Sequence, residues 1–197
     1  MVLIIHTVFF LRKYFSRVYS YFIFKITEYI NDFENALYGK EINLEEYIYV
    51  DSFAKFYIVN EIMGNNEVNH PKSCYFTFDD EDKILSAGPV WDFDWARVYS
   101  SGVIIKNGIY YDKLFIYPEV SEKVEELLAS EELSVENIEK EIEDMKSKIA
   151  ASVTLDKIVW GVHSDAVGSN FGTFDGYVEN LKLCTKNRLE FLKEYDF

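Results

Sequence analysis

The chain has 197 residues, of which 49% are hydrophobic and 27% charged, so it is long enough for one domain with a core and too apolar to be disordered. Its net charge of −14 argues against binding to nucleic-acid backbones or anionic membranes, because both are negatively charged. Its two cysteines, Cys74 and Cys184, are too few for a thiolate zinc site; they permit one disulfide, although two isolated cysteines are more often ordinary buried thiols.

Residues 1–25 form an atypical apolar segment at the start of the chain. Residues 1–11 are mostly apolar, a stretch too short to span a bilayer, and Arg12, Lys13 and Arg17 follow it. A signal peptide carries its basic residues before the apolar stretch and has small residues at a cleavage site. A weak signal peptide is an alternative, but the order of charges favours a buried or truncated leading segment and no stable membrane span.

Two helices are predicted over residues 18–63 from their apolar spacing and their end residues. The first helix ends at Gly39, since glycine is common at helix C-termini. The second is expected to have Asp51 as its N-cap, to run to Met63 and to end at Gly64. The apolar stripe of the first helix comprises Val18, Phe22, Ile26, Tyr29, Ile30, Phe33 and Leu37.

A β-hairpin is predicted next, between a polar loop and a pair of acids. The loop spans 65–73, and the strands are expected over 74–78 and 83–87, joined by a turn. Asp92 and Asp94 follow the second strand directly. Because a hairpin brings its two ends together, the loop before it and the acids after it are expected to face one pocket.

The rest of the chain is predicted to be helical. A short helix at 110–115 precedes one opened by Pro118, another capped by Ser134 and a last one from about Asp175. The loop at 161–173 lacks phosphate-loop glycine spacing and is expected to be a plain connection. The residues expected to face inward are Val120, Val124, Leu127, Leu128, Val135, Ile138, Ile142, Met145, Ile149, Val178, Leu181, Leu189 and Leu192.

The paired acids Asp92 and Asp94 are the most informative feature of the chain. A carboxylate held near apolar walls generally needs a cation partner, and a hard metal ion carrying phosphate would serve. Taken alone, two acids at this spacing are more typical of a turn with exposed side chains, but their place after the hairpin favours a site. The side chains expected to shield them from water are Val90, Trp91, Phe93 and Trp95.

The order of the elements predicts an α+β fold that is mainly α. A helix, a polar loop, a hairpin, paired acids and further helices follow one another, as in the C-terminal lobe of a protein kinase. In that lobe a catalytic loop with a base and a metal-binding amide precedes a hairpin that ends at the metal-binding acid. We therefore expect a protein-kinase-like C-lobe with one β-hairpin between the catalytic loop and the metal-binding acids.

The stretches around the predicted hairpin form a recognisable set of motifs: VNEI at 59–62, GN at 64–65, HPKSCY at 70–75 and AGPVWDFDW at 87–95, supported by YIYVDSF at 47–53, YYDKLF at 110–115, Pro118 and RLEFL at 188–192. With these motifs the sequence resembles the CotH kinase family, named for the spore coat protein H of bacteria, over roughly residues 26–197, the C-terminal half of a typical member. The resemblance implies a kinase-like fold that uses ATP and Mg²⁺ or Mn²⁺ to phosphorylate Ser or Thr of coat or surface proteins, with a location at the spore coat, at the cell surface or outside the cell.

By position in this resemblance, Asp92 matches the metal-binding acid of the family's WDFD motif, and Glu67 falls where many members place the catalytic aspartate. Ser73 falls near the metal-binding asparagine of the catalytic loop, whereas His70 is expected to pack or to hydrogen-bond within the loop. A solvated or turn-forming role is the alternative for Asn65 and Glu67. The resemblance thus assigns catalysis to Glu67 and Asp92, metal binding to Asp92 and Asp94, and cofactor binding to Asn65, Lys72, Ser73 and Asp94.

Two departures from the family pattern bear on activity. Glu67 adds a methylene where the family has aspartate, and a misplacement of about 1 Å can cost roughly a hundredfold in rate. Nothing before residue 50 resembles the glycine-rich loop and lysine that grip ATP in a kinase N-terminal lobe, so a truncated member is expected. The alternative function is a non-catalytic binding or coat-assembly domain. A glycosidase using Asp92 with Glu67 is a third alternative that the hairpin order does not favour.

Overall fold

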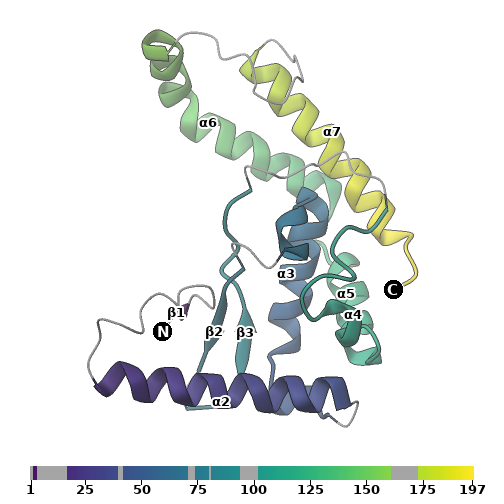
Figure 1. The fold of residues 1–197 in the computed structure, drawn as a ribbon. Coiled ribbons are helices and arrows are strands. Elements are labelled where there is room, and N and C mark those ends of the chain that lie inside the picture. Colours follow the sequence, from purple (N-terminus) through teal and green to yellow (C-terminus); the bar gives the residue numbers. More distant parts are fainter. Residues whose placement is uncertain are drawn as a thin grey trace. The chain divides into compact units, whose positions relative to one another are not determined.

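The computed structural model describes residues 2–3, 17–39, 42–70, 74–79, 81–93, 102–160 and 173–197, with only the backbone described for 2–3 and 17–22. The chain divides into two compact units, residues 1–127 with Phe197 and residues 128–196. The described residues are mainly helical and contain one antiparallel hairpin, as the order of the elements predicts (Figure 1).

Helix α2 (Arg17–Gly39) confirms the predicted amphipathic helix and its C-terminal end. Ile26, Phe33 and Leu37 are buried, whereas Asp32 is exposed. The buried residues recur at the spacing of one helix face, so burial of a single stripe accounts for where the helix packs.

Helix α3 (Val50–Met63) begins two residues earlier than predicted, and Asp51 is not its N-cap. The N-cap is Tyr49, whose backbone N–H pairs with the hairpin, so the chain leaves its extended conformation there. The carboxylate of Asp51 instead lies 2.8 Å from the ammonium of Lys55, one turn along the helix. The predicted end at Gly64 is confirmed: its φ of 64° is left-handed, a conformation that glycine adopts without a Cβ clash.

The hairpin consists of β2 (Phe76–Phe78) and β3 (Leu85–Ala87), with Phe76 opposite Ala87. The two-residue strand β1 (Val2–Leu3) adds to the other edge of β2. Both strands are shorter than predicted: β2 begins two residues later, at Phe76, and β3 begins two residues later because the turn takes up more of the chain. The N–H of Lys83 donates to the carbonyl of Asp79, and the left-handed φ of 59° at Lys83 ends the extended pairing.

The hairpin is anchored on both sides within the first unit. The backbone of Leu85 exchanges hydrogen bonds of 2.8 and 2.9 Å with Tyr47 and Tyr49, just before α3. Helix α2 crosses the hairpin near its turn, where the ring of Tyr29 lies 4.6 Å from that of Phe78 (Figure 1). The opposite end of the hairpin, where β2 begins and β3 ends, is therefore the end away from α2.

The core of the first unit is built largely from aromatic side chains. Phe53 stacks on Phe76 with ring centroids 5.5 Å apart, and Tyr57 lies 5.1 Å from Tyr111. The buried hydroxyl of Tyr111 donates a 2.8 Å hydrogen bond to the carbonyl of Phe53. Each such ring contributes about 1.5–3 kcal/mol by burial. This use explains why aromatic residues make up 17% of the chain.

The predicted helices after the acids are confirmed. The short helix is α4 (Tyr111–Leu114), and α5 (Pro118–Leu128) starts at its proline. Val120 and Val124 on α5 are completely buried. Proline suits the first position of a helix because its missing N–H would have no helical partner there.

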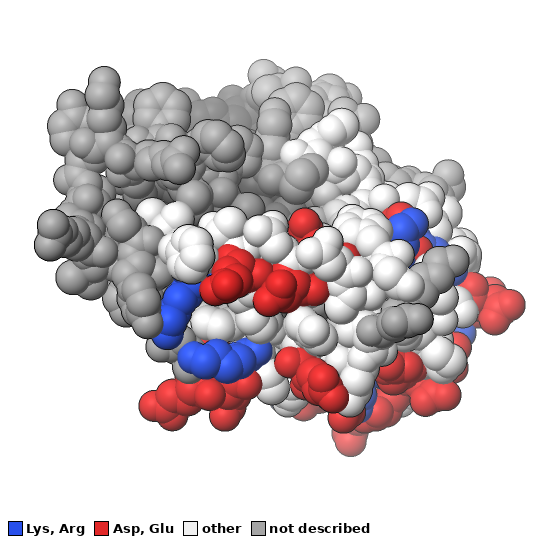
Figure 2. Space-filling model, turned by 60° about the horizontal axis from the view of Figure 1, so that its bottom comes forward, with Lys and Arg blue, Asp and Glu red and all other residues white. Residues whose placement is uncertain are grey.

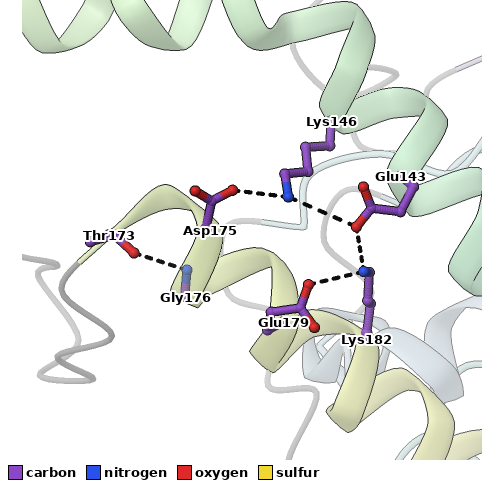
Figure 3. Close-up of polar contacts among 7 residues, drawn as sticks. All are labelled: Glu143, Lys146, Thr173, Asp175, Gly176, Glu179 and Lys182. Atoms are coloured by element: carbon purple, nitrogen blue, oxygen red, sulfur yellow. Dashed lines mark hydrogen bonds and ion pairs between the residues drawn. The ribbon is translucent and has the colours of Figure 1, made fainter.

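The second unit contains α6 (Val135–Trp160) and α7 (Phe174–Lys193). The predicted cap at Ser134 is confirmed, since its hydroxyl accepts a 3.2 Å hydrogen bond from the N–H of Asn137. The N-cap of α7 is Thr173, whose hydroxyl accepts the N–H of Gly176 at 3.1 Å (Figure 3). Of the expected inward residues on α7, Val178, Leu189 and Leu192 are buried, and Leu181 is half-buried.

The predicted apolar stripe of α6 is wrong in its later part. Val135, Ile138 and Ile142 are half-buried, but Met145 and Ile149 are 58% and 44% exposed. No residue of α6 is buried within the part of the chain that the structure describes. Helical spacing alone shows which residues share a face, and it does not show how far a neighbouring element extends along that face.

Acidic side chains cover more of the described surface than basic ones on the face shown in Figure 2, in line with the net charge of −14. Among the described residues, no helix is both long and apolar enough to cross a membrane. Cys74 and Cys184 are both thiols, so the disulfide alternative is not formed.

Candidate functional site

The loop after α3 is held in place by a chain of amide groups. The Asn65 side chain accepts the N–H of Glu67 at 3.2 Å and donates to the amide oxygen of Asn60 at 2.9 Å. Asn60 in turn donates to the carbonyl of Phe56 within α3 at 2.8 Å. These bonds start the short 3₁₀ turn η3 (Asn66–Asn69) and give the buried Asn65 a structural role, whereas its cofactor role stays a prediction.

Glu67 is half-buried on this turn, and its backbone is fixed by Asn65. Its Oε2 atom is buried and has no hydrogen-bond partner among the described residues. A buried carboxylate oxygen without a partner is costly, so a cation or a substrate hydroxyl at this atom would be stabilising.

Cys74 lies close enough to Glu67 for the two groups to interact electrostatically. Burial, and then the negative charge of Glu67, raise the pKa of the Cys74 thiol to about 11. The thiol is therefore protonated at neutral pH, and thiolate chemistry is disfavoured here. This proximity also places Glu67 near the start of the hairpin, because Cys74 directly precedes Tyr75.

The start and end of the hairpin meet at the end away from α2. The N–H of Gly88 donates to the carbonyl of Tyr75 at 2.9 Å, and the hydroxyl of Thr77 donates to the carbonyl of Gly88 at 3.2 Å. The ring of Tyr75 lies 6.3 Å from that of Trp91, edge to face. The structure thus brings the residue after Cys74 against the residue before Asp92.

The expectation that Val90 and Trp91 shield Asp92 from water is wrong. Val90 and Trp91 are 40% and 60% exposed, and Asp92 is exposed as well. Strand β3 ends at Ala87, so the following side chains are no longer directed into the core by strand pairing. Asp92 has a left-handed φ of 63°, which is uncommon for a residue with a side chain and is enriched at functional sites.

Three predicted site residues, Lys72, Ser73 and Asp94, lie outside the described residues. Within the described ranges, no group of three or more His, Cys, Asp and Glu side chains is arranged to hold a metal ion. The described part of the predicted metal site is therefore one exposed carboxylate, that of Asp92. An exposed carboxylate oxygen suits Mg²⁺, which keeps several waters and needs few protein ligands.

His70 has an exposed side chain, and its backbone N–H donates to the carbonyl of Glu67 at 2.9 Å. The loop hydrogen bond expected for this residue therefore comes from its backbone. The bond closes the last turn of η3 and helps to fix the position of Glu67.

Sequence reasoning missed the role of Glu61, which is completely buried on α3. Its Oε1 accepts the N–H groups of Ile104 and Ile105 at 2.8 and 2.7 Å, and its Oε2 lies 3.0 Å from the N–H of Ile104. The signal was available: Glu61 stands three residues after Ile58 and next to Ile62, on the apolar side of a helix. A charged residue at such a position needs a buried partner.

A model of the CotH kinase protein family matches residues 18–192. No curated protein and no solved structure gave a significant match. The family match spans most of the chain, so this protein belongs to the CotH kinase family, as the motifs around the hairpin predict.

Proposed function

We propose that the chain is a kinase-like phosphotransferase domain that transfers phosphate from ATP to Ser or Thr of a coat or surface protein. Residues 26–197 form the C-terminal lobe in this proposal. Family membership supports the reaction class. The observation that carries the site is Glu67, whose buried Oε2 finds no partner among the described residues while its backbone is held by the Asn65 side chain.

The proposed roles follow from the chemistry of each group. The Glu67 carboxylate accepts the proton of the acceptor hydroxyl. Asp92 and Asp94 hold the divalent metal, and Lys72 neutralises phosphate charge. When bound, ATP with its metal supplies the phosphoryl group and the charge neutralisation. Asn65 and Ser73 are the remaining cofactor-binding residues in this proposal.

A non-catalytic binding or coat-assembly domain is the second candidate. Two observations favour it: glutamate stands at position 67 in place of the family's aspartate, and the Asn65 amide already bonds within the loop. A domain that keeps these structural bonds without turnover would retain the fold and lose the phosphate transfer.

Thermal unfolding with ATP and Mg²⁺ or Mn²⁺ tests nucleotide binding. We expect the metal with ATP to raise the unfolding temperature, and Asp92→Ala to abolish that rise. Glu81→Gln is the matched control, because Glu81 is an exposed acid of the hairpin turn that is held by its backbone N–H, which donates to Asp79. A rise that persists in Asp92→Ala would contradict the metal assignment.

Transfer of labelled phosphate to a Ser-rich peptide separates the two candidates. We expect Glu67→Gln to lower kcat by about 10²–10⁴-fold, the usual contribution of a general base, with ATP binding retained. Nucleotide-dependent stabilisation without any transfer by the unmodified chain would favour the non-catalytic domain. No stabilisation and no transfer would rule out both ATP binding and catalysis by this chain.

A further inference from the structure

The carboxylate of Glu61 joins two parts of the chain that are more than forty positions apart. Glu61 is completely buried, and both of its oxygens accept backbone N–H groups from the segment 102–105. Hydrogen bonds to a charged acceptor are shorter and stronger than neutral ones. The segment is therefore fixed to α3 by the backbone of Ile104 and Ile105, whatever side chains it carries.

The peptide group that joins Ile104 to Ile105 also bonds to the loop that carries Glu67, the candidate base. The carbonyl of Ile104 accepts a 2.9 Å hydrogen bond from the side-chain amide of Asn69. Asn69 belongs to η3, two residues after Glu67, and its amide also lies 2.6 Å from the oxygen of Asn66. One peptide thus connects the Glu61 carboxylate to the turn that holds Glu67.

Gly108 makes this approach possible. A Cβ built on Gly108 would lie 2.5 Å from the side-chain oxygen of Asn69 and 3.4 Å from its Cα. Any other residue at 108 would push Asn69 or the segment away. The close contact shows that the segment 102–108 is packed directly on the loop.

We infer that Glu61 is a positioning residue, which acts through Ile104 and Asn69 to hold the loop carrying Glu67 in place. The role of Glu67 as a catalytic base rests on the proposed function, whereas the support of its loop by Glu61 does not.

Amide hydrogen exchange tests the support directly. In Glu61→Gln, an isosteric change that replaces one acceptor oxygen with an NH₂ group, we expect faster exchange at Ile104 and Ile105 and also at the N–H of Glu67. Val124→Ala is the control, because it truncates a buried side chain of the same unit that makes none of these hydrogen bonds. Faster exchange confined to Ile104 and Ile105 would overturn the inference.

Asn69→Ala provides a second variant, since it removes the link to Ile104 without a change in the buried carboxylate. We expect it to raise exchange at Glu67 and, combined with Glu61→Gln, to add little more, because both act through one peptide. Fully additive effects would contradict a shared route.

Kinetics then separate positioning from simple loss of stability. At a temperature well below unfolding, we expect Glu61→Gln to lower kcat for phosphate transfer by at least about tenfold with little change in KM for ATP, since a displaced base slows chemistry. Val124→Ala should leave kcat unchanged. If the unmodified chain transfers no phosphate, the proposed function fails, and the exchange at Glu67 still decides whether Glu61 supports the loop.

Discussion

The two units of the chain are stabilised in different ways. In residues 1–127, a charged side chain is completely buried, as Glu61 is, and is satisfied by backbone N–H groups. In residues 128–196, Arg188 is buried as well, at 3% exposure, but the side chains of the ion pairs that join α6 and α7 are 17–74% exposed (Figure 3). Helix α6 has no buried residue in its described length, and Ile158 near its end is 75% exposed.

This difference indicates which unit can hold groups at fixed positions. A buried carboxylate with three N–H contacts is costly to displace, because each abandoned group loses its partner. Exposed ion pairs gain little, since water and salt compete with them. Fixed geometry is what catalysis requires, so the first unit is the one suited to the proposed site.

The largest expected contrast is in core truncation. Phe53→Ala removes a completely buried ring that stacks on Phe76, and it should lower the free energy of unfolding by about 3–5 kcal/mol. Leu155→Ala on α6 should change it by less than about 0.5 kcal/mol, because Leu155 is exposed. Urea unfolding followed by circular dichroism measures both. Equal effects would remove the contrast between the units.

The loop bonds come next in size. Asn65→Ala leaves the oxygen of Asn60 and the N–H of Glu67 without their partner, so we expect a loss of about 1–3 kcal/mol in the free energy of unfolding. Asn187→Ala on α7 is the control, since Asn187 is exposed. A change in Asn65→Ala no larger than in the control would show that the loop is held by other contacts.

Cys74 provides a chemical reporter of Glu67. Because burial and then Glu67 raise the pKa of its thiol to about 11, native Cys74 should react slowly with iodoacetamide at pH 8 in a Cys184→Ser background. Glu67→Gln should speed labelling a few-fold, while Glu81→Gln should not. Equal rates in the two variants would mean that Glu67 lies too far from Cys74 to affect it.

The sign of the Cys74 contribution to stability follows from the same shift. The folded pKa, about 11, exceeds the unfolded value of roughly 8.5, so the folded state favours the protonated thiol. Its contribution is fully present below about pH 8.5 and is lost as the pH rises through about 11. Unfolding at pH 8 and at pH 10.5, with Cys74→Ser as the comparison, checks the direction.

The smallest expected effect concerns the surface ion pairs of the second unit. Lys182 pairs with Glu143 and, at 3.0 Å, with Glu179, and Lys146 lies 2.9 Å from Asp175 (Figure 3). We expect Lys182→Gln to lower the unfolding temperature slightly at low salt and to have no effect in 1 M NaCl, where the screening length is about 3 Å. Lys186→Gln is the control, since the ammonium of Lys186 lies 3.9 Å from the carboxylate of Glu190, a longer and therefore weaker pair.

The ion pair between Lys182 and Glu143 also predicts how the stability of the fold changes at low pH. The hydrogen bond from Lys182 lowers the pKa of Glu143 below its usual value, so the pair stabilises the fold above the unfolded pKa of roughly 4.3. That contribution is lost as the pH falls through the lower folded pKa. A Lys182→Gln effect that is unchanged between pH 6 and pH 3 would contradict the pairing.

Local signals in the sequence predicted the elements well. Gly64 ends α3 and Pro118 begins α5 because these residues have strong backbone preferences of their own. The start of α3 was misplaced at Asp51, since the pairing of Tyr49 with the hairpin outweighed the capping preference of an aspartate. Helix spacing also overestimated the buried length of the α6 stripe, because spacing carries no information on the neighbour.

The candidate site was predicted in part. The motifs around the hairpin identified the family, and Tyr75 lies beside Trp91, as expected if the two ends of the hairpin meet. That the loop and the paired acids face one pocket stays a prediction. The exposure of Asp92 was not predicted, because it depends on where strand pairing stops. The pairing of Glu61 with Ile104 was also missed, since nothing local links residues that far apart in the chain.

The sequence by itself determined the order of helices and hairpin and the family, because both depend on short stretches with strong local preferences or specific motifs. Only the tertiary structure decided which polar groups are satisfied. Glu61 is held by backbone N–H groups, while Oε2 of Glu67 is buried with no partner in the described chain. The physical reason is that the environment of a carboxylate depends on which distant backbone folds against it. Backbone N–H groups lie against Glu61, whereas none of the described chain donates to Oε2 of Glu67, only six positions away.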